Sequence, residues 1–493
     1  MTSEANKPTP SIERIAICGA GLAGHITAAA LSRHLPRSIQ ITLVDCQDNA
    51  DTDLFYGSVT GPSAYDFHLS AGLREPSLVL ESDTAFSFGT RYVRWGGNDR
   101  SWMQCFHQPL PILDQVLFHH YLTQQNLDQL EPFLVSAVAA RKGAFAHPPE
   151  QNAHPLSPAE YGYQFDPASY AELFAGATDK ARVDVVASTI SVVECGPNRI
   201  EAIRCADGRL LTADLYVDCT GPKALLLSRL ASDFSGNRRL RAAVSRIPAD
   251  QLGAPCRSLM AADFGWQADT PLKGSIMRHT IFVPEAEASA LLAHGMAPAQ
   301  TGEVTLGCYA QAWCGNCVGI GQAAAVFEPL TPAPIMLLQR DIERLLSLIP
   351  FSDEMSVERR EYNRQYAEDC THTELFNRAL FETPGLPDTP YWRVARDEPI
   401  HEKLARKIEL FENRGVHVAF DLEPFNQEDW TILHYGMGRR PARYDRVADQ
   451  MPEGKIRNYL SNMRGAIENM VEAMPSHDAY MKNLTSYLMQ QKG

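Results

Sequence analysis

A glycine-rich turn near the N-terminus constrains the fold of this chain more than any other feature. Gly19, Gly21 and Gly24 form a complete Gly-x-Gly-x-x-Gly pattern directly after an apolar stretch. The first glycine allows a tight turn, the second lets the backbone approach a pyrophosphate, and the third lets a helix pack closely on a strand. The phosphates are expected at the N-terminus of that helix, beside Leu22 and Ala23.

The elements around the turn follow the order that a dinucleotide-binding unit needs. The pattern predicts a strand over Ile15–Cys18, an alanine-rich helix over Ile26–Leu35 and a second strand over Ile39–Val44. Asp45 ends the second strand and is placed to accept hydrogen bonds from a ribose. The sequence therefore predicts an α/β fold that begins with a Rossmann-like dinucleotide-binding domain.

Composition and charge exclude several classes of protein. The chain has 493 residues, 45% of them hydrophobic, which is enough for a substantial core. The formal net charge is −14 and the basic residues are scattered, so nucleic acid is not an expected partner. No stretch of about 18 apolar residues occurs, and the N-terminus lacks a signal-peptide pattern, so neither a membrane span nor secretion is indicated. The cytoplasm is the expected compartment, and the eleven cysteines are expected to be reduced.

The rest of the chain divides by pattern into three regions. Residues 1–240 and 310–350 are predicted to form a discontinuous cofactor-binding domain. Residues 241–309 alternate apolar and polar positions and predict a β-rich substrate lobe. Residues 351–493 show helix-period apolar positions and predict a helical C-terminal cap. A helical pattern is also predicted to run from Pro111 through Gln124 to Ala140.

Two later segments favour FAD over NAD as the cofactor. Residues 213–221 read as a buried strand that ends at a glycine, and residues 318–324 read as another strand followed by a glycine turn. Each segment alone is typical of a core strand with a turn. Together they can meet two parts of a long, extended cofactor, as is typical of FAD proteins.

The ordered motifs resemble the flavin-dependent tryptophan halogenase family, a branch of the flavin monooxygenases. The resemblance covers most of the chain and rests on the glycine turn, on Tyr163–Tyr170, on residues 213–221 and, most specifically, on Gly315–Leu330. It implies an enzyme that uses reduced FAD and oxygen to form a flavin hydroperoxide for halogenation of an aromatic, indole-like substrate. It also implies a separate flavin reductase. By the same resemblance, Ile190, Gly321 and Leu330 are expected to contact FAD.

Two positions depart from the family's catalytic pattern. The family lysine that directs hypohalous acid falls on Ser87, and the family glutamate that follows Glu-Pro-Leu falls on Thr331. A hydroxyl group cannot supply the charge of an ammonium or a carboxylate. Pro332 and Pro334 also remove two backbone N–H donors where the resemblance places the halide-binding amides. The sequence therefore leaves the use of halide open.

The family's Trp-x-Trp-x-Ile-Pro signature is only partly present. It appears here as Trp266-Gln-Ala-Asp-Thr-Pro271, in which the second tryptophan is missing. Trp266 and Glu328 are the expected substrate contacts, although a buried structural role for Trp266 is an equal alternative. Three functions stay open: a halogenase, a hydroxylating monooxygenase and a flavin-binding homologue without halogenase activity. No metal site is expected, and the oligomeric state stays open, with a homodimer among the alternatives.

Overall fold

The computed structural model describes residues 11–46, 53–97, 100–106, 109–149, 156, 159–231, 233–397 and 399–492. Its first layer is a six-stranded sheet in the order β19-β20-β13-β1-β2-β9, which is parallel except for β19. Its strands are β1 (Arg14–Cys18), β2 (Gln40–Asp45), β9 (Val183–Ala187), β13 (Leu215–Asp218), β19 (Trp313–Cys314) and β20 (Cys317–Gly319).

Helices cover this sheet and fix the glycine turn at its edge. The helix α1 (Leu22–His34) joins β1 to β2 and packs against α7 (Pro167–Ala177) and α9 (Ala333–Ser347). The helix begins at Leu22, four residues earlier than predicted, because the turn ends at Gly21. The carboxyl ends of the parallel strands β1, β2, β13 and β20 meet at one edge, which is where α/β sheets bind ligands.

A second, eight-stranded sheet lies at the centre of the molecule, in the order β21-β18-β14-β17-β16-β15-β4-β5. Its strands are β4 (Gly89–Val93), β5 (Ser101–Cys105), β14 (Phe234–Pro248), β15 (Arg257–Ala262), β16 (Gly265–Leu272), β17 (Ser275–Phe282), β18 (Gln300–Tyr309) and β21 (Ala325–Val326). Three of them, β4, β5 and β21, come from outside residues 241–309. The pairing of β4 with β15 joins segments far apart in sequence, which a local pattern does not reveal.

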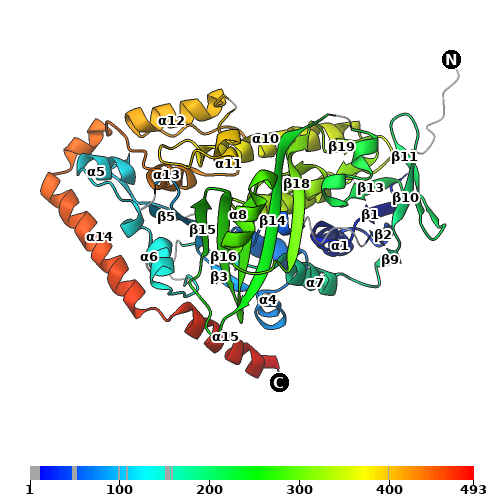
Figure 1. Ribbon diagram of the computed structural model, residues 1–493, viewed down its shortest axis with the longest axis horizontal. Helices are drawn as coiled ribbons and strands as arrows, with labels where there is room; N and C mark the ends of the chain where they lie inside the picture. The colour runs from blue at the N-terminus through cyan, green and yellow to red at the C-terminus, as the bar shows by residue number, and fades with distance from the viewer. Residues whose placement is uncertain are drawn as a thin grey trace, which may run out of the picture.

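Helices form the C-terminal region, and the described residues confirm this part of the prediction. Figure 1 shows them in yellow to red: α10 runs along the top, α12, α13 and α14 lie on the side of the central sheet away from α1, and α15 lies below. They are α10 (Ser356–Ala379), α11 (Pro390–Val394), α12 (Glu402–Arg414), α13 (Gln427–Gly436), η7 (Arg446–Gln450), α14 (Glu453–Ala473) and α15 (His477–Lys492).

Shorter elements connect these layers. An antiparallel three-stranded sheet, β10-β11-β12, returns the chain from β9 to β13. The others, with those three strands, are η1 (Leu54–Tyr56), α3 (Ala64–Ser70), α4 (Glu75–Glu81), β3 (Ala85–Ser87), β6 (Ile112–Leu113), β7 (Val116–Leu117), α5 (Phe118–Gln124), η2 (Glu131–Phe133), α6 (Val135–Lys142), β8 (Gly162–Gln164), β10 (Ile190–Cys195), β11 (Ile200–Cys205), β12 (Leu210–Leu211), η3 (Gly221–Lys223), η4 (Leu227–Arg229), η5 (Pro284–Ala286), α8 (Glu287–His294) and η6 (Gly321–Ala323).

The helix predicted from Pro111 through Gln124 to Ala140 is wrong over residues 111–117 and is interrupted between α5 and α6. The strands β6 and β7 form a hairpin there, and its two turn residues, Asp114 and Gln115, have φ angles of 48° and 64°. Two consecutive residues with positive φ are typical of the tight turns that join hairpin strands. Asn126, with φ 53°, then follows α5 and separates it from α6.

A cluster of aromatic rings holds β3 in place. Phe86 stacks on Phe145 with ring centroids 4.6 Å apart, and Tyr480 of α15 packs on Phe145 at 5.3 Å. The Tyr480 hydroxyl is also 2.6 Å from His147 Nδ1. The C-terminal helix therefore helps to position the strand that carries Ser87.

Candidate active site

The glycine turn has the geometry that close packing of a helix on a strand requires. Gly19 has φ 101°, and a Cβ atom on it would lie 2.3 Å from the carbonyl oxygen of Cys219. A Cβ atom on Gly24 would lie 1.8 Å from the carbonyl oxygen of Gly19. Neither position accepts a larger side chain without a backbone shift. The turn therefore fits the close backbone approach that a dinucleotide needs.

The start of α1 already binds a carboxylate. The backbone N–H of Leu22 donates to Asp53 Oδ2 at 2.8 Å, just after the N-cap residue Gly21. Burial raises the pKa of Asp53 to about 7, although the bond from Leu22 opposes that shift. An oxyanion thus lies where the sequence predicts a phosphate, beside Leu22 and Ala23. The donor chemistry at this point fits FAD, and Asp53 is a residue that the sequence pattern did not identify.

Asp45 and Ile190, the residues predicted to contact the ribose and the adenine, lie near each other in the structure. The Cys46 thiol, next to Asp45, donates to the carbonyl oxygen of Val44 at 3.7 Å and lies close to the backbones of Ile190 and Gly19. Burial raises the pKa of this thiol to about 11, and the neighbouring backbones of Ile190 and Gly19 oppose the shift. Asp45 and Ile190 therefore lie on the same edge as the glycine turn, although their contacts with a cofactor stay a prediction.

Gly321 and Leu330, which are also predicted to contact the cofactor, lie on turns that are contacted by buried tyrosines. Gly321 has φ 60°, and the Tyr56 hydroxyl would lie 2.3 Å from a Cβ atom placed there. The same hydroxyl accepts the backbone N–H of Gln322 at 3.0 Å. The carbonyl oxygen of Leu330 accepts the Tyr92 hydroxyl at 2.8 Å. Tyr56 and Tyr92 are thus positioning residues that the sequence pattern missed.

Thr331 lines a cavity of about 380 Å³ next to these turns. Its walls come from α3, β4, β5, α9, α10 and the start of α13, and the aromatic residues among them are Tyr92, Phe106, Phe376 and Phe425. Polar residues also line it, among them Thr90, Gln104 and Asp429. Cavities of this size and composition hold small aromatic molecules. The four rings come from distant segments, so no sequence motif could have assembled them.

Ser87 is fully buried at the end of β3. Its hydroxyl donates to the carbonyl oxygen of Gly89 at 3.2 Å and accepts the N–H of the same residue at 3.1 Å. Within the described part of the chain, Ser87 is not among the residues that line the cavity. Its side chain therefore serves the local turn into β4, and a catalytic role stays a prediction.

Thr331 lies at the start of α9, and its hydroxyl is engaged there. The oxygen accepts the N–H of Ala333 at 3.3 Å and donates to Asn377 Oδ1 at 3.5 Å. Pro332 and Pro334 have no N–H to offer. At this helix start, residues 332 and 334 therefore offer no N–H to an anion, and the N–H of Ala333 is already bonded.

Glu328 and Trp266 bind each other rather than the cavity that Thr331 lines. The indole N–H of Trp266 donates to Glu328 Oε1 at 2.7 Å, the Tyr391 hydroxyl donates to the same oxygen, and Arg238 Nη1 is 2.8 Å from Oε2. Trp266 is fully buried and Glu328 is 3% exposed. Glu328 lines a separate cavity of about 580 Å³ with Arg238. A substrate contact by either residue stays a prediction.

The buried side chain of Arg257 contacts the backbone just before Thr331. The Arg257 guanidinium donates to the carbonyl oxygens of Pro329, at 2.8 Å, and Leu330. Burial lowers the pKa of Arg257 to about 10, and no carboxylate pairs with it among the described residues. Arg257 is the register partner of Thr90, which lines the cavity. No pattern in the sequence distinguishes this arginine from the others.

Neither a candidate metal site nor a membrane-spanning helix occurs among the described residues. No group of three or more histidine, cysteine, aspartate or glutamate side chains there could hold a metal ion. No helix in that part of the chain is long and apolar enough to cross a membrane.

Comparisons with known proteins agree on one family. The family described as tryptophan halogenase matches residues 14–453. Tryptophan 6-halogenase ThaL of Streptomyces albogriseolus is 25% identical over 444 residues, covering 81% of this chain and 82% of its own. Tryptophan 7-halogenase RebH of Lentzea aerocolonigenes is 24% identical and covers 98% and 99%. The structure is similar to that of BrvH, a flavin-dependent halogenase from Brevundimonas sp. BAL3, with a TM-score of 0.88, 26% identity and coverage of 96% and 99%.

Proposed function

The chain belongs to the tryptophan halogenase family and is a flavin-dependent enzyme whose cofactor is FAD, and on that premise we propose that it halogenates an aromatic, indole-like substrate. The observation that carries this proposal is the 380 Å³ cavity lined by Tyr92, Phe106, Phe376 and Phe425. Aromatic walls bind a flat aromatic ring through area burial and edge-to-face contacts. Gln104 and Asp429 would orient the polar groups of that ring.

FAD would be held by the residues at the edge of the six-stranded sheet. Gly19, Gly21 and Gly24 would admit its pyrophosphate beside Leu22 and Ala23, and Asp45 would bind a ribose. When bound and reduced, FAD supplies the electrons that activate oxygen. The reduced cofactor would come from a separate reductase. The adenine would lie near Ile190, and the ring system near Gly321 and Leu330.

We further propose that this chain is a divergent member in which Ser87 and Thr331 occupy the positions of the family's lysine and glutamate. Both hydroxyls are bonded to nearby backbone, so neither presents a charge to the cavity. Directing the electrophile would then depend on how tightly the aromatic walls hold the ring. A low rate of halogenation and a loose choice of ring position are the expected consequences.

Hydroxylation is the second candidate, and one observation favours it. The start of α9 offers few free N–H groups to a halide, because Pro332 and Pro334 lack them and Ala333 donates to Thr331. A site that binds no halide but still activates oxygen would add oxygen to the ring instead.

Product analysis separates the two candidates. The purified protein receives photoreduced FAD, oxygen and bromide, together with a panel of indoles, phenols and pyrroles, and the products are analysed by mass spectrometry. A bromine isotope pattern supports halogenation, and addition of one oxygen atom supports hydroxylation. If FAD binds but no compound in the panel is converted, both candidates are overturned.

The variant Ser87→Lys tests the assigned position, with Ser87→Ala as the matched control. Lysine at residue 87 would supply the cation that the resemblance assigns to this position, so we expect brominated product to rise by about a hundredfold. Ser87→Ala removes the hydroxyl without adding charge and is expected to match the natural protein. Equal yields from both variants would contradict the assignment of residue 87.

A further inference from the structure

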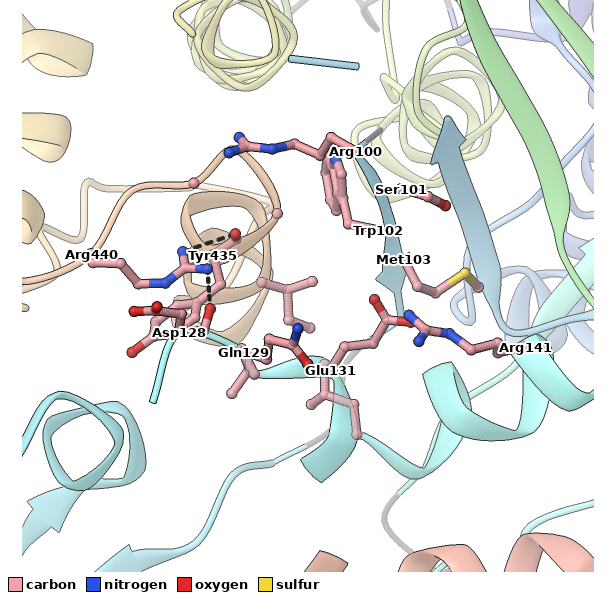
Figure 2. A pocket seen from close by; sticks show the side chains of 15 residues that line it. Arg100, Ser101, Trp102, Met103, Asp128, Gln129, Glu131, Arg141, Tyr435 and Arg440 are labelled. Atoms are coloured by element: carbon pink, nitrogen blue, oxygen red, sulfur yellow. Dashed lines mark hydrogen bonds and ion pairs between the residues drawn. The ribbon is translucent and has the colours of Figure 1, made fainter. Parts of the chain in front are cut away.

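A second cavity, of about 470 Å³, lies next to the candidate active site, and Figure 2 shows the side chains that line it. The two cavities share β5 and α13. Gln104 and Asp429 face the first, whereas Trp102 and Ile432 line the second. The Trp102 ring stacks on Tyr92, with centroids 4.6 Å apart. The second cavity is therefore distinct from the first but touches its wall.

Two arginines face this cavity without an ion-pair partner. Arg440 donates to the backbone carbonyls of Tyr435, Arg439 and Asp128, which carry no net charge. The Arg100 guanidinium packs over Gly438, where a Cβ atom would lie 2.5 Å from its terminal nitrogens. No ion pair involves either arginine among the described residues. Figure 2 shows both side chains at the margin of the same opening.

Arg440 is partly buried, and several neighbours act on its charge. Burial lowers the pKa of Arg440, Tyr435 and Asp128 oppose that shift, and Arg100 makes a smaller contribution in the same direction as burial. Of the other charged groups in the lining, Glu131 pairs with Arg141, and the exposed Asp128 acts on Arg440 as a nearby negative charge. Two like charges beside one cavity are relieved when an anion binds between them.

The lining also has an apolar part. Trp102, Met103, Leu130, Leu134 and Ile432 line the cavity together with the polar residues Ser101 and Gln129. The Trp102 ring fits because residue 436 is glycine, since a Cβ atom there would lie 2.1 Å from Trp102 Cε3. A molecule that suits this site has an anionic end and an apolar body. The volume falls within the range of small-molecule pockets.

We propose that this cavity binds a small organic carboxylate, with the carboxylate on Arg100 and Arg440 and the apolar body on Trp102 and Ile432. A ligand there would contact the Trp102 ring, which stacks on Tyr92. The Tyr92 hydroxyl in turn donates to the carbonyl oxygen of Leu330, the residue before Thr331. The site is thus placed to influence the active-site wall. It does not depend on which reaction that site performs.

Binding of matched probes tests the proposal by calorimetry on the FAD-loaded protein. Phenylacetate and phenylacetamide share a ring and differ in charge, so phenylacetate is expected to bind about tenfold more tightly. Arg100→Gln is expected to remove this preference, and Arg100→Lys to keep part of it. Arg464→Gln, which removes an exposed arginine of α14, is the control for charge and is expected to change nothing.

Two further measurements locate the site. Phenylacetate is expected to quench tryptophan fluorescence in the natural protein and not in Trp102→Phe, which keeps the stacked ring. Phe425→Ala alters the first cavity and is expected to leave phenylacetate affinity unchanged. Equal affinity for the two probes, or equal affinity before and after Arg100→Gln, would overturn the proposal. Charge-dependent binding of inorganic phosphate alone would overturn the organic carboxylate as the ligand.

Discussion

Replacing Glu328 with glutamine tests whether this residue is structural or contacts the substrate. The carboxylate is 3% exposed and receives bonds from Trp266, Tyr391 and Arg238. Glutamine keeps the shape of the side chain but removes the charge. Burial alone would lower the pKa of Arg238, whereas the Glu328 carboxylate raises it above its ordinary value. The substitution therefore leaves a buried guanidinium without its counter-ion.

The expected loss follows from this geometry. Breaking a buried ion pair by removing one partner costs about 3–5 kcal/mol. Arg238 Nε and Nη2 already lack hydrogen-bond partners among the described residues, so the guanidinium has no alternative acceptor there. Its contact with the Tyr391 ring, 4.6 Å away, compensates only in part. We therefore expect Glu328→Gln to lower the free energy of unfolding by about 3–5 kcal/mol.

A double-mutant cycle measured by urea unfolding isolates this interaction. Arg238→Met removes the cation, so the double variant is expected to lose at least about 2 kcal/mol less than the sum of the two single losses. The exposed pair Arg464–Glu468, at 3.5 Å, is the matched control and is expected to contribute under about 1 kcal/mol. If the two single losses of unfolding free energy add up to the loss of the double variant within about 0.5 kcal/mol, the reasoning is refuted. Full stability with a raised KM would instead support a substrate contact by Glu328.

Three further predictions concern the cofactor and pH. Gly24→Ala is expected to abolish flavin absorbance in the purified protein, because its Cβ would lie 1.8 Å from a carbonyl oxygen, whereas Gly176→Ala, with open space around it, should retain FAD. Asp53, whose pKa burial raises to about 7, is protonated as pH falls, so FAD affinity should rise from pH 8 to pH 6, by at most about tenfold per unit. Asp53→Asn should make fluorescence titrations independent of pH, and a flat profile in the natural protein would contradict this role. Burial lowers the pKa of His119 to about 4 and of His417 to about 3, so each unfolded histidine gains its proton near pH 6.5, before the folded one. Stability should therefore fall below pH 6.5, by about 2 kcal/mol per histidine at pH 5, and unchanged urea midpoints between pH 7 and pH 5 would argue against it.

The sequence predicted those parts of the fold that local spacing encodes. The glycine turn, the strand before it and the helix after it follow from short-range rules, and the structure has them within a few residues. The hairpin at Asp114 and Gln115 was missed because neither residue is a glycine, so the positive φ angles left no signal in the sequence. The extent of the central sheet was missed for a different reason. Its β4–β15 pairing is non-local, and local patterns carry no register information across such a distance.

The residues of the candidate site likewise include some that the sequence could locate and others that only the structure reveals. Ser87 and Thr331 could be located by their place in ordered motifs, but what their hydroxyls bind could not be. Arg257 illustrates the limit, because its importance lies in two carbonyl oxygens that the fold brings to it and in the lack of a nearby carboxylate. An arginine in a strand is normally a surface residue. Only the assembled structure distinguishes a buried cation from an exposed one.

The ring cluster around β3 affects the order in which parts of the chain can pack during synthesis. Tyr480 of α15 closes this cluster over Phe86 and Phe145, next to Ser87. Because α15 follows every other described element, the strand β3 stays incompletely packed on the ribosome until synthesis has passed residue 480. The glycine turn and its βαβ unit are complete long before that. A nascent chain could therefore form its βαβ unit early and would complete the packing around residue 87 only after residue 480 has been synthesised.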